Sequence, residues 1–472
     1  MVVTPLNPLL SAPELTTLLA ECEAETLAVL TLCYDQAKSI QPHTALKRII
    51  ATSIKEYLPL RLRLLFTLLR EQRDGHRIQL HPQDFWFGEL LTAYAHAPRP
   101  TVAVSPDAPA VILMSGGTTG TPKGAVGLHR SLVAAGLQIH AWLQPVLEDW
   151  HDVILLPLPL FHVYGHIGGL SVALVGHNPL ALIPNPRDIT DVLRTIRQVR
   201  PAFFGSVPAL FIALLQHPAV QAGKVDFRSI KCCFSGAAPL LAETKQRFEA
   251  LTRGRIIEGY SLTEAMLACV CNPVRGLNKL RSVGLPLPDV ELDIVDAEAG
   301  VQSLAPAEVG EVVLRAPQLM AEYWHNPTAT AAALRRRDAG GPWLYTGDLG
   351  YLDADGYLFL VDRKTDLIKT SGYQVWPQEI EEVIAAHPTV AEVGVAGVPD
   401  AVKGEVAKAW VVLHPGASTT EGDIRAFCRE HLAPYKVPAY VELRPALPKT
   451  LLVGKVLRRQ LVEEHRHARA SA

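Results

Sequence analysis

Short apolar runs alternate with amphipathic segments through the middle of this 472-residue chain. The runs at residues 154–156, 202–207 and 230–234 predict buried strands, and apolar residues at helical spacing predict a helix at residues 189–199. Strands that alternate with helices favour parallel α/β layers, because each helix crosses over and covers one face of the sheet. We therefore expect layered α/β subdomains in this part of the chain.

The pattern changes after residue 289. Residues 290–295 and 311–315 alternate between apolar and polar side chains, which predicts half-solvated antiparallel strands and a β-rich subdomain. It changes again after Asp362, where a compact α+β unit is expected. The predicted elements of this unit are a helix, two strands and a helix, at residues 377–386, 393–398, 409–413 and 423–431.

These changes predict two domains, and a chain of this length favours more than one. The large domain is expected at residues 1–362 and the small domain at residues 363–472, with the boundary near residues 362–365. No internal repeat is visible, and no long low-complexity segment separates the two.

Composition excludes several classes of function. The chain is 49% apolar and 19% charged, and its net charge of −2 gives no global field for nucleic acid. The seven cysteines form no Cys-x-x-Cys pair, so neither a disulfide framework nor a zinc site is expected, and a reducing cytosol is the default. The beginning of the sequence does not read as a signal peptide. We therefore expect a cytoplasmic protein without a nucleic-acid partner.

Hydroxyl and glycine residues crowd one segment behind the apolar run at residues 111–114. The segment contains Ser115, Gly116, Gly117, Thr118, Thr119, Gly120 and Lys123. Glycines let backbone N–H groups approach an anion, and the hydroxyls and the lysine can hold its oxygens, which predicts a triphosphate-binding loop. It is not a Walker A loop, because glycine rather than serine or threonine follows Lys123. The alternative is a plain turn after a strand.

Further segments carry groups suited to the same ligand. They are Phe161-His162 after a strand, a small-residue turn at residues 235–239, Glu258-Gly259-Tyr260-Ser261-Leu262-Thr263-Glu264, and Asp348 on an expected turn. A flat ring could lie on the small-residue turn and against Tyr260, and Mg²⁺ prefers oxygen ligands such as Glu264. Asp348 could accept hydrogen bonds from ribose hydroxyls. The alternatives are a packed histidine at His162 and a turn-capping role for Asp348.

In their order and spacing, these motifs resemble the adenylate-forming superfamily of acyl-CoA synthetases, adenylation domains of peptide synthetases and luciferases. The resemblance covers about residues 7–461. Through the motifs at residues 116–120, 158–162, 258–264 and 362–369, the chain is most similar to bacterial long-chain fatty-acid:CoA ligases. The resemblance implies a two-step ligation, in which ATP and a carboxylic acid give an acyl adenylate and a thiol such as coenzyme A then displaces AMP.

The resemblance also implies roles for single residues. Ser115 to Gly124 would hold pyrophosphate, Thr263 would contact phosphate, Glu264 would hold Mg²⁺, and Glu258 to Tyr260 with Gly236, Ala237 and Ala238 would flank adenine. Asp348 and Arg363 would hold the ribose, His162 would border the acyl and thiol path, and Lys455 would bridge carboxylate and phosphate. A mobile small domain would rotate near Thr365 to deliver Lys455 for the first step and the loop from Lys369 to Gly372 for the second.

The chain departs from the family pattern in four places. Thr365 occupies the hinge, Ser261 replaces a glycine, and one extra residue precedes Gly454-Lys455. The first residues resemble a point well inside the family's N-terminal subdomain, so we expect a shortened start with exposed strand edges and lower stability. A degraded, nonenzymatic acyl- or nucleotide-binding protein is therefore kept as an alternative to the enzyme.

Two questions of partner and substrate stay open in the sequence. Residues 58–73 mix leucines with four arginines; we expect a surface helix of the large domain, and the alternative is a helix that touches the inner face of a membrane. A medium- or long-chain fatty acid is the expected substrate, against an aryl acid or transfer to a carrier protein. Free coenzyme A is favoured because no carrier segment follows Lys455.

Overall fold

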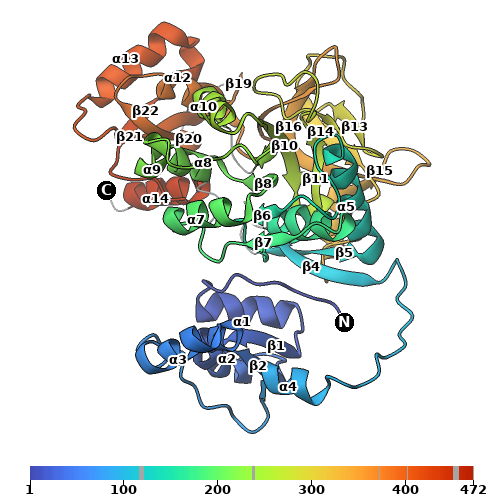
Figure 1. The fold of residues 1–472 in the computed structure, drawn as a ribbon. Helices are drawn as coiled ribbons and strands as arrows, with labels where there is room; N and C mark the ends of the chain where they lie inside the picture. Colours follow the sequence, from blue (N-terminus) through green and yellow to red (C-terminus); the bar gives the residue numbers. More distant parts are fainter. Residues whose placement is uncertain (116–121, 237–239, 371–372, 401, 450–455, 471–472) are drawn as a thin grey trace. The chain divides into compact units, whose positions relative to one another are not determined.

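The computed structural model describes all residues except 116–121, 237–239, 371–372, 401, 450–455 and 471–472. Its contacts divide the chain into two compact units, residues 1–129 and residues 130–472, which are described separately (Figure 1). Among the described residues, no helix is both long enough and apolar enough to cross a membrane.

Unit 1 contains a three-stranded parallel sheet and a two-stranded antiparallel ribbon. The sheet has the order β1 (Thr26–Leu30), β2 (Arg48–Thr52) and β3 (Phe85–Trp86), and the ribbon pairs β4 (Pro109–Ser115) with β5 (Lys123–Leu128). Its helices are α1 (Ala12–Glu21), α2 (Tyr34–Ile40), α3 (Leu60–Leu69) and α4 (Phe87–Ala93). Tyr34 and Ile49 are fully buried in the small core, and Asp84 accepts hydrogen bonds there from the Tyr34 hydroxyl and the Ile49 N–H.

Unit 2 begins with a seven-stranded sheet of order β12-β11-β10-β9-β8-β6-β7. The strands are β6 (Ile154–Leu156), β7 (Leu180–Leu182), β8 (Phe203–Ser206), β9 (Cys232–Ser235), β10 (Arg255–Leu262), β11 (Leu267–Cys271) and β12 (Leu285–Pro286). β6 to β10 pair in parallel, whereas β11 and β12 are antiparallel. The predicted buried strands and the parallel α/β arrangement are confirmed.

Helices of unit 2 precede or connect the parallel strands β6 to β10 in chain order. They are α5 (His129–Leu143), α6 (Val172–Val175), α7 (Ile189–Val199), α8 (Pro208–Gln216), α9 (Pro218–Gln221) and α10 (Ala242–Thr252). The predicted helix is confirmed as α7: the Asp188 side chain caps its start by accepting from the Asp191 N–H, and Arg200 ends it in a left-handed conformation. Its buried face consists of Val192, Leu193 and Ile196.

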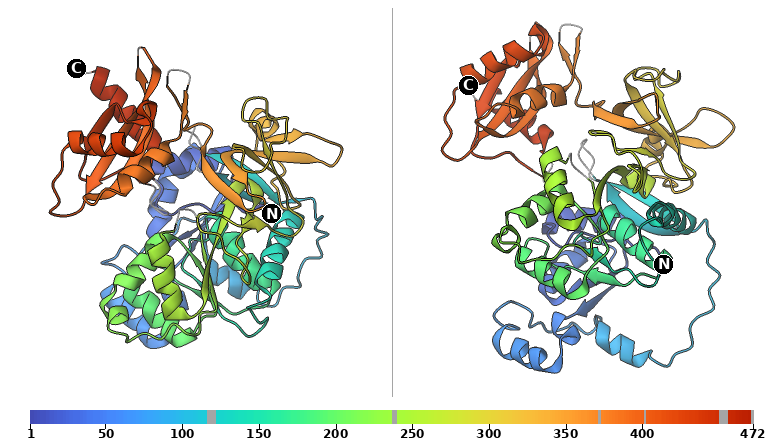
Figure 2. Two further views of the ribbon diagram at one scale, coloured as in Figure 1. Left: turned by 90° about the horizontal axis from the view of Figure 1, so that it is seen from above. Right: turned by 45° about the horizontal axis from the view of Figure 1, so that its top comes forward.

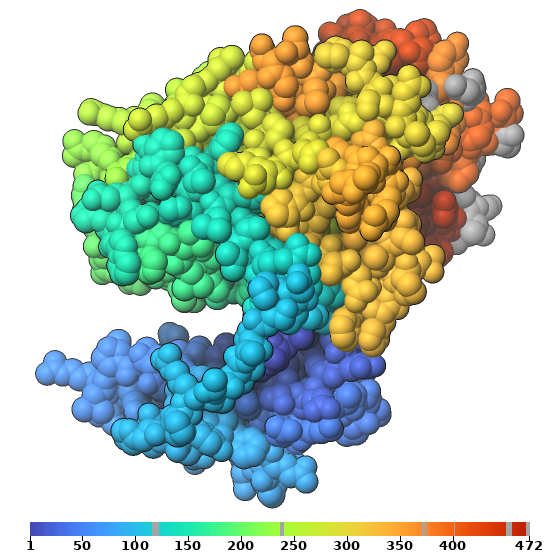
Figure 3. All heavy atoms as spheres, turned by 90° about the vertical axis from the view of Figure 1, so that its right-hand side faces the viewer, coloured from blue at the N-terminus to red at the C-terminus, as the bar shows by residue number. Residues whose placement is uncertain are grey.

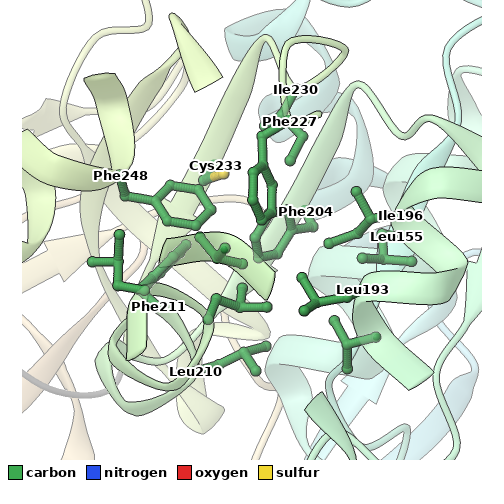
Figure 4. Packing of buried hydrophobic residues seen from close by; sticks show 14 of the residues in the cluster. Leu155, Leu193, Ile196, Phe204, Leu210, Phe211, Phe227, Ile230, Cys233 and Phe248 are labelled. Carbon is green, nitrogen blue, oxygen red and sulfur yellow. The ribbon is translucent and has the colours of Figure 1, made fainter. Parts of the chain in front are cut away.

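A phenylalanine cluster joins two of these helices to the sheet (Figure 4). Phe204 of β8 packs with Phe211 of α8 and Phe248 of α10, and the rings of Phe211 and Phe248 meet edge to face at 5.0 Å between centroids. Burying a phenylalanine side chain contributes about 1.5–3 kcal/mol to folding. The cluster therefore fixes β8 and β9, whose carboxyl ends carry Ser206 and Ser235.

A second sheet of unit 2 is antiparallel throughout, as the alternating pattern predicts. Its order is β13-β14-β16-β15, with β17 paired to β16. The elements are β13 (Glu291–Val295), β14 (Gly310–Arg315), α11 (Pro327–Ala333), β15 (Leu334–Arg336), β16 (Pro342–Leu352) and β17 (Leu358–Arg363). Figure 3 shows this part of the chain in yellow and light orange, at the surface of unit 2.

Two expectations for this sheet are wrong. β14 is not half-solvated, because it is buried from Gly310 to Leu314 and even Glu311 is only 3% exposed. The Glu311 carboxylate is paired with the Lys364 ammonium at 2.8 Å, which offsets the cost of burying its charge. Asp348 lies within β16 rather than on a turn, because β16 runs on to pair with β17, where Asp348 stands opposite Arg363.

The last part of unit 2 is an α+β layer, shown in orange and red in Figure 2. The sheet has the order β19-β18-β21-β20, with β22 parallel to β21. Its elements are β18 (Ile368–Thr370), β19 (Tyr373–Val375), α12 (Pro377–Ala385), β20 (Val390–Asp400), β21 (Gly404–Leu413), α13 (Glu421–His431), β22 (Tyr440–Leu443) and α14 (Arg458–Ala470). The predicted order of helix, two strands and helix is confirmed, with longer strands than expected.

Candidate active site

The proposed phosphate loop lies in unit 1, between the strands of its ribbon. Ser115 ends β4, Lys123 begins β5, and the two residues are paired across the ribbon. Residues 116–121, which include Gly116, Gly117, Thr118, Thr119 and Gly120, lie outside the described part of the chain. The ribbon thus brings the buried Ser115 opposite Lys123, and the phosphate-binding role of the segment stays a prediction.

Three predicted residues from three strands of unit 2 lie in contact: Tyr260 and Arg363 both contact the Asp348 carboxylate. The Tyr260 hydroxyl of β10 donates a hydrogen bond to Asp348 Oδ2, and Arg363 Nε of β17 lies 3.2 Å from Asp348 Oδ1. Tyr260 and Asp348 are buried, and burial, together with the neighbouring charge of Asp348, raises the pKa of the Tyr260 hydroxyl well above its ordinary value. The tyrosine is therefore a hydrogen-bond donor at neutral pH. A carboxylate held in this way keeps lone pairs with which it can accept from the hydroxyls of a sugar.

A tyrosine that the sequence analysis did not single out holds the predicted metal ligand. Thr263 and Glu264 lie in a short 3₁₀ turn, Thr263–Ala265, directly after β10. The Tyr323 hydroxyl donates to Glu264 Oε1 at 2.7 Å, and burial with the Glu264 charge raises the pKa of Tyr323. The turn ends at Met266, which has a φ of 47° and is fully buried. A left-handed methionine costs conformational energy, which is typical of functional turns.

The donor set at Glu264 fits magnesium bound together with phosphate. Mg²⁺ usually binds one or two protein carboxylates, and the rest of its ligands are water and substrate phosphates. One Glu264 oxygen is held by Tyr323, which aligns the carboxylate and leaves the other oxygen for a cation. Within the described ranges, no group of three or more histidine, cysteine, aspartate or glutamate side chains could hold a metal by itself.

Glu258 and Gly259 occupy β10 just before Tyr260. Lys245 Nζ lies 3.5 Å from Glu258 Oε1, and burial raises the pKa of Glu258 although Lys245 opposes this shift. A Cβ atom at Gly259 would lie 2.3 Å from the Phe234 ring and 2.9 Å from the Val270 carbonyl oxygen. The glycine is therefore required by packing, and a contact of either residue with adenine stays a prediction.

His162 lies six residues beyond the end of β6 and two residues before a π-helix, Tyr164–Ser171. Its Nδ1 accepts a hydrogen bond from the Tyr164 N–H at 3.2 Å. Burial lowers the pKa of His162, so the ring is neutral at pH 7. With Nδ1 as the acceptor, Nε2 carries the proton and can donate to an anionic group.

Tyr164 fills the space beside His162. Its hydroxyl donates to the Phe234 carbonyl at 2.8 Å and lies 3.3 Å from the Ser206 carbonyl. A Cβ atom at Gly205 or Gly236 would lie only 3.0 or 3.3 Å from the Tyr164 ring. The predicted adenine-contact residue Gly236 thus packs on this ring, whereas Ala237 and Ala238 lie outside the described residues.

An apolar recess of about 10 Å³ remains beside Tyr164. It is lined by Ile139, Tyr164, Gly168, Phe203, Phe234, Ser261, Leu267 and Ala268. A recess of this size holds about one water molecule, so the tyrosine occupies most of the room between β8, β9 and the π-helix. A larger substrate would need Tyr164 to move.

A larger hollow of about 420 Å³ lies elsewhere in unit 2, beside β15 and β16. One of its arginines is already paired: Arg337 contacts the Asp293 carboxylate at 2.7 Å and lies over the Trp343 ring. None of the predicted site residues lines it. We therefore attribute the hollow to packing in the β-rich sheet.

The segment after β17 is held by an arginine that the sequence analysis did not single out. Arg458, the first residue of α14, contacts Glu381 through two nitrogens, and its Nη1 lies 3.0 Å from Asp362 and 2.9 Å from Asp366. Asp362 also accepts from the N–H of Gln378 at the start of α12. These contacts cross the predicted hinge at Thr365, which is exposed. We call Arg458, Glu381, Asp362 and Asp366 the hinge cluster.

The predicted residues of the small domain are only partly visible. Lys369 is exposed on β18, and its N–H donates to Glu405 at 3.0 Å. Gly372 and Lys455 lie outside the described residues, as does the extra residue before Lys455. The chain on either side of residues 450–455 is joined by a bridge between Lys449 and Val456. The roles of the two lysines stay predictions.

Known proteins resemble this chain in sequence and in fold. Residues 1–324 match the family model of AMP-binding enzymes, and residues 379–451 match that of the AMP-binding enzyme C-terminal domain. The chain belongs to the AMP-binding enzyme family. A long-chain fatty-acid–CoA ligase of Bacillus subtilis (strain 168) is 37% identical to this AMP-binding enzyme over 471 residues, 98% of this chain and 81% of the relative.

Two solved structures extend the likeness. ATP-bound MatB from Rhodopseudomonas palustris is 28% identical, with a TM-score of 0.80 over 98% of this chain and 84% of its own. The anthranilate CoA ligase AuaEII, in complex with anthranoyl-AMP, is 27% identical, with a TM-score of 0.80 over 99% of this chain and 83% of its own. The predicted superfamily and its fold, a large N-terminal α/β domain and a small C-terminal domain, are confirmed. This AMP-binding enzyme is thus an adenylate-forming ligase.

Proposed function

We propose that this AMP-binding enzyme is an acyl-CoA synthetase that activates a medium- or long-chain fatty acid. A carboxylate oxygen attacks the α-phosphorus of ATP, and pyrophosphate leaves. The thiol of coenzyme A then attacks the acyl carbonyl carbon, the bond to the phosphate oxygen breaks, and AMP leaves as the thiol loses its proton. The observation that carries the proposal is the Asp348 carboxylate, held between Tyr260 and Arg363 in a chain 37% identical to a fatty-acid–CoA ligase.

The first step joins two anions, so its rate depends on cations and donors placed where charge develops. Loss of one such contact typically costs about 3–4 kcal/mol in the transition state. We assign Ser115, Lys123 and Thr263 to the phosphates, Asp348 and Arg363 to the ribose, and Lys455 to the junction of carboxylate and phosphate. Glu264, aligned by Tyr323, would hold Mg²⁺, which would offset the charge of the phosphate oxygens.

His162 and Tyr164 support an acyl site in unit 2. The neutral His162 ring can donate from Nε2 to an oxygen of the acid, and apolar side chains line the recess beyond Tyr164. An alkyl chain would enter where the Tyr164 ring now lies. We further propose that the two steps alternate by rotation of residues 363–472 about Thr365, with Lys369 and Gly372 on the loop that serves the thiol step.

An aryl acid is the second candidate substrate, and one observation favours it. If Tyr164 moves, a flat ring would fit the place that its ring leaves, beside the rings of Phe203 and Phe234, better than a long chain would. The anthranilate CoA ligase of similar fold carries an aryl adenylate.

Release of AMP and pyrophosphate, measured over a panel of acids, tests the proposal. The panel contains saturated acids from butanoate to octadecanoate, benzoate and 4-hydroxycinnamate, each with and without coenzyme A. We expect turnover that needs both coenzyme A and an alkyl acid of eight or more carbons. Turnover with the aryl acids alone would establish the second candidate, and no release with any acid would favour a nonenzymatic binding protein.

A further inference from the structure

Helix α3 of unit 1 exposes leucines along its whole length. Its ten residues, Leu60–Leu69, include no buried side chain. The leucines at positions 60, 62, 64, 65, 68 and 69 are between 52% and 79% exposed. Single exposed leucines are ordinary, but six exposed leucines on one ten-residue helix are not, and a concentration of apolar surface of this kind marks a site of interaction. The helix therefore presents a surface that is built to contact something apolar.

The helix is an anchored part of unit 1. Lys55, before the helix, forms an ion pair with Glu71, after it. This ion pair links the two ends of the segment that contains α3. Phe66 packs edge to face on His76 at 5.1 Å, and the buried His76 ring is hydrogen-bonded to Thr31. A ten-residue helix is marginal in water by itself. These contacts hold its C-terminal end while the leucines stay outside.

The charges of the helix identify the chemistry of its partner. Residues 60–70 contain three arginines, at positions 61, 63 and 70, and no acidic residue, in a chain whose net charge is −2. Arg70 lies 3.9 Å from Asp74, whereas Arg61 and Arg63 form no ion pair within the described part of the chain. A surface of leucine and unpaired arginine matches the boundary of an anionic bilayer, where acyl chains lie beneath negative head groups.

Other partners fit less well. A second copy of α3 would bring the two sets of arginines together, and like charges at close range repel. An α-helix rises 1.5 Å per residue, so ten residues span about 15 Å, half the thickness of the hydrocarbon core of a bilayer. The helix can therefore lie in the head-group region, but it is too short to cross the hydrocarbon core. Arginine side chains are long enough to reach the phosphates while the leucines are immersed.

We propose that α3 binds the surface of membranes that contain anionic lipid. The leucines supply the apolar contact, and Arg61 and Arg63 supply the preference for negative head groups. Binding at this helix does not depend on which acid the enzyme activates, so it can be tested apart from the ligase reaction.

The test uses the full chain with unilamellar vesicles of phosphatidylcholine, either pure or containing one third phosphatidylglycerol, in flotation assays. We expect binding to the anionic vesicles at least tenfold stronger than to the neutral ones, and weaker at high salt. The double variant Leu64→Ser/Leu68→Ser should bind at least tenfold less to both. Arg61→Gln/Arg63→Gln should lower anionic binding to the neutral level.

Val133→Ser/Leu137→Ser is the matched control, because these α5 side chains are also four residues apart and are 56% and 51% exposed. It should bind like the unchanged protein. In Leu65→Trp, the emission that this variant has beyond that of the unchanged protein, which contains seven tryptophans, should shift to shorter wavelength on anionic vesicles and be quenched by brominated lipid. Equal binding of the leucine variant and the unchanged protein would overturn the proposal. So would an indole that stays in water, or a vesicle-free dimer that Leu64→Ser/Leu68→Ser dissociates.

Discussion

At the scale of single residues, the site is built from side chains whose partners fix their state. Tyr260 and Tyr323 are kept protonated by burial beside Asp348 and Glu264, so each donates one hydrogen bond to a carboxylate. Each carboxylate is thereby aligned before any ligand arrives. Preorganised groups of this kind need no reorganisation during the reaction.

Tyr164 should control the size of the acid that is accepted. In Tyr164→Ala, the ring no longer fills the recess, so kcat/KM for a long or bulky acid should rise at least tenfold relative to a short one. The lost ring should cost about 3–5 kcal/mol of unfolding free energy. Tyr164→Phe is the control: it keeps the ring, loses only the hydroxyl with its contacts to the Phe234 and Ser206 carbonyls, and should cost about 1 kcal/mol without a change of preference. The measurement is kcat/KM for each acid of the panel, taken below the unfolding temperature of each variant. An unchanged ratio in Tyr164→Ala would contradict the assignment.

At the scale of elements, the hinge cluster joins the start of α14 to both sides of the predicted hinge. Rotation about Thr365 would move Asp362 away from Arg458 and from the N–H of Gln378. A charged group that loses its partner must be solvated again, so these contacts favour one orientation of the small domain. We therefore expect the first residue of α14 to contribute to the balance between the two proposed half-reactions.

Arg458→Met should change that balance. The variant leaves three carboxylates without their common partner, which should cost about 2–3 kcal/mol of stability and alter the rate of acyl-adenylate formation relative to that of thioester formation at least fivefold. Arg444→Met is a matched control, because Arg444 is as exposed as Arg458 and pairs with Glu464, away from the hinge. Arg444→Met should lose stability but keep the ratio of the two half-reaction rates. Single-turnover assays of both half-reactions measure this ratio, and Arg458→Lys should return it part of the way to that of the unchanged enzyme. Two arginine variants with the same ratio would refute the role of the hinge cluster.

At the scale of the whole molecule, the proposed reaction would use groups that are far apart in the sequence, from Ser115 to Lys455. A two-step ligation can use one ATP site for both steps if a small domain exchanges the side chains that it presents. The residues expected to do so, Lys369 and Lys455, are separated by most of that domain.

Lys455→Ala should therefore separate the half-reactions. Acyl-adenylate formation should fall at least a hundredfold, because the cation between carboxylate and phosphate is removed, which corresponds to about 2.7 kcal/mol. Conversion of supplied acyl adenylate and coenzyme A to thioester should stay within twofold of the unchanged enzyme. Lys449→Ala, which removes a lysine paired with Glu392 on the same domain, should affect neither. A parallel fall of both half-reactions in Lys455→Ala would show that the lysine does not act in the first step alone.

The sequence by itself determined the elements and the family of this protein. Hydrophobic periodicity is a local property, so β6, α7, β13 and α13 could be predicted to within a few residues. The resemblance to a known family pointed to Tyr260, Asp348 and Arg363, which the structure brings together. Where the alternating pattern failed, at Glu311, a distant lysine had made burial of a carboxylate possible.

Only the tertiary structure decided which groups position these residues. Tyr323 is 59 residues from Glu264 and Arg458 is 96 from Asp362, and no periodicity or motif links such pairs. Tyr164 looked like any aromatic residue in an apolar run until the close approach of Gly205 and Gly236 showed the space that it fills. The exposure of α3 was equally hidden, because whether a leucine-rich helix is covered depends on what the rest of the chain packs against it.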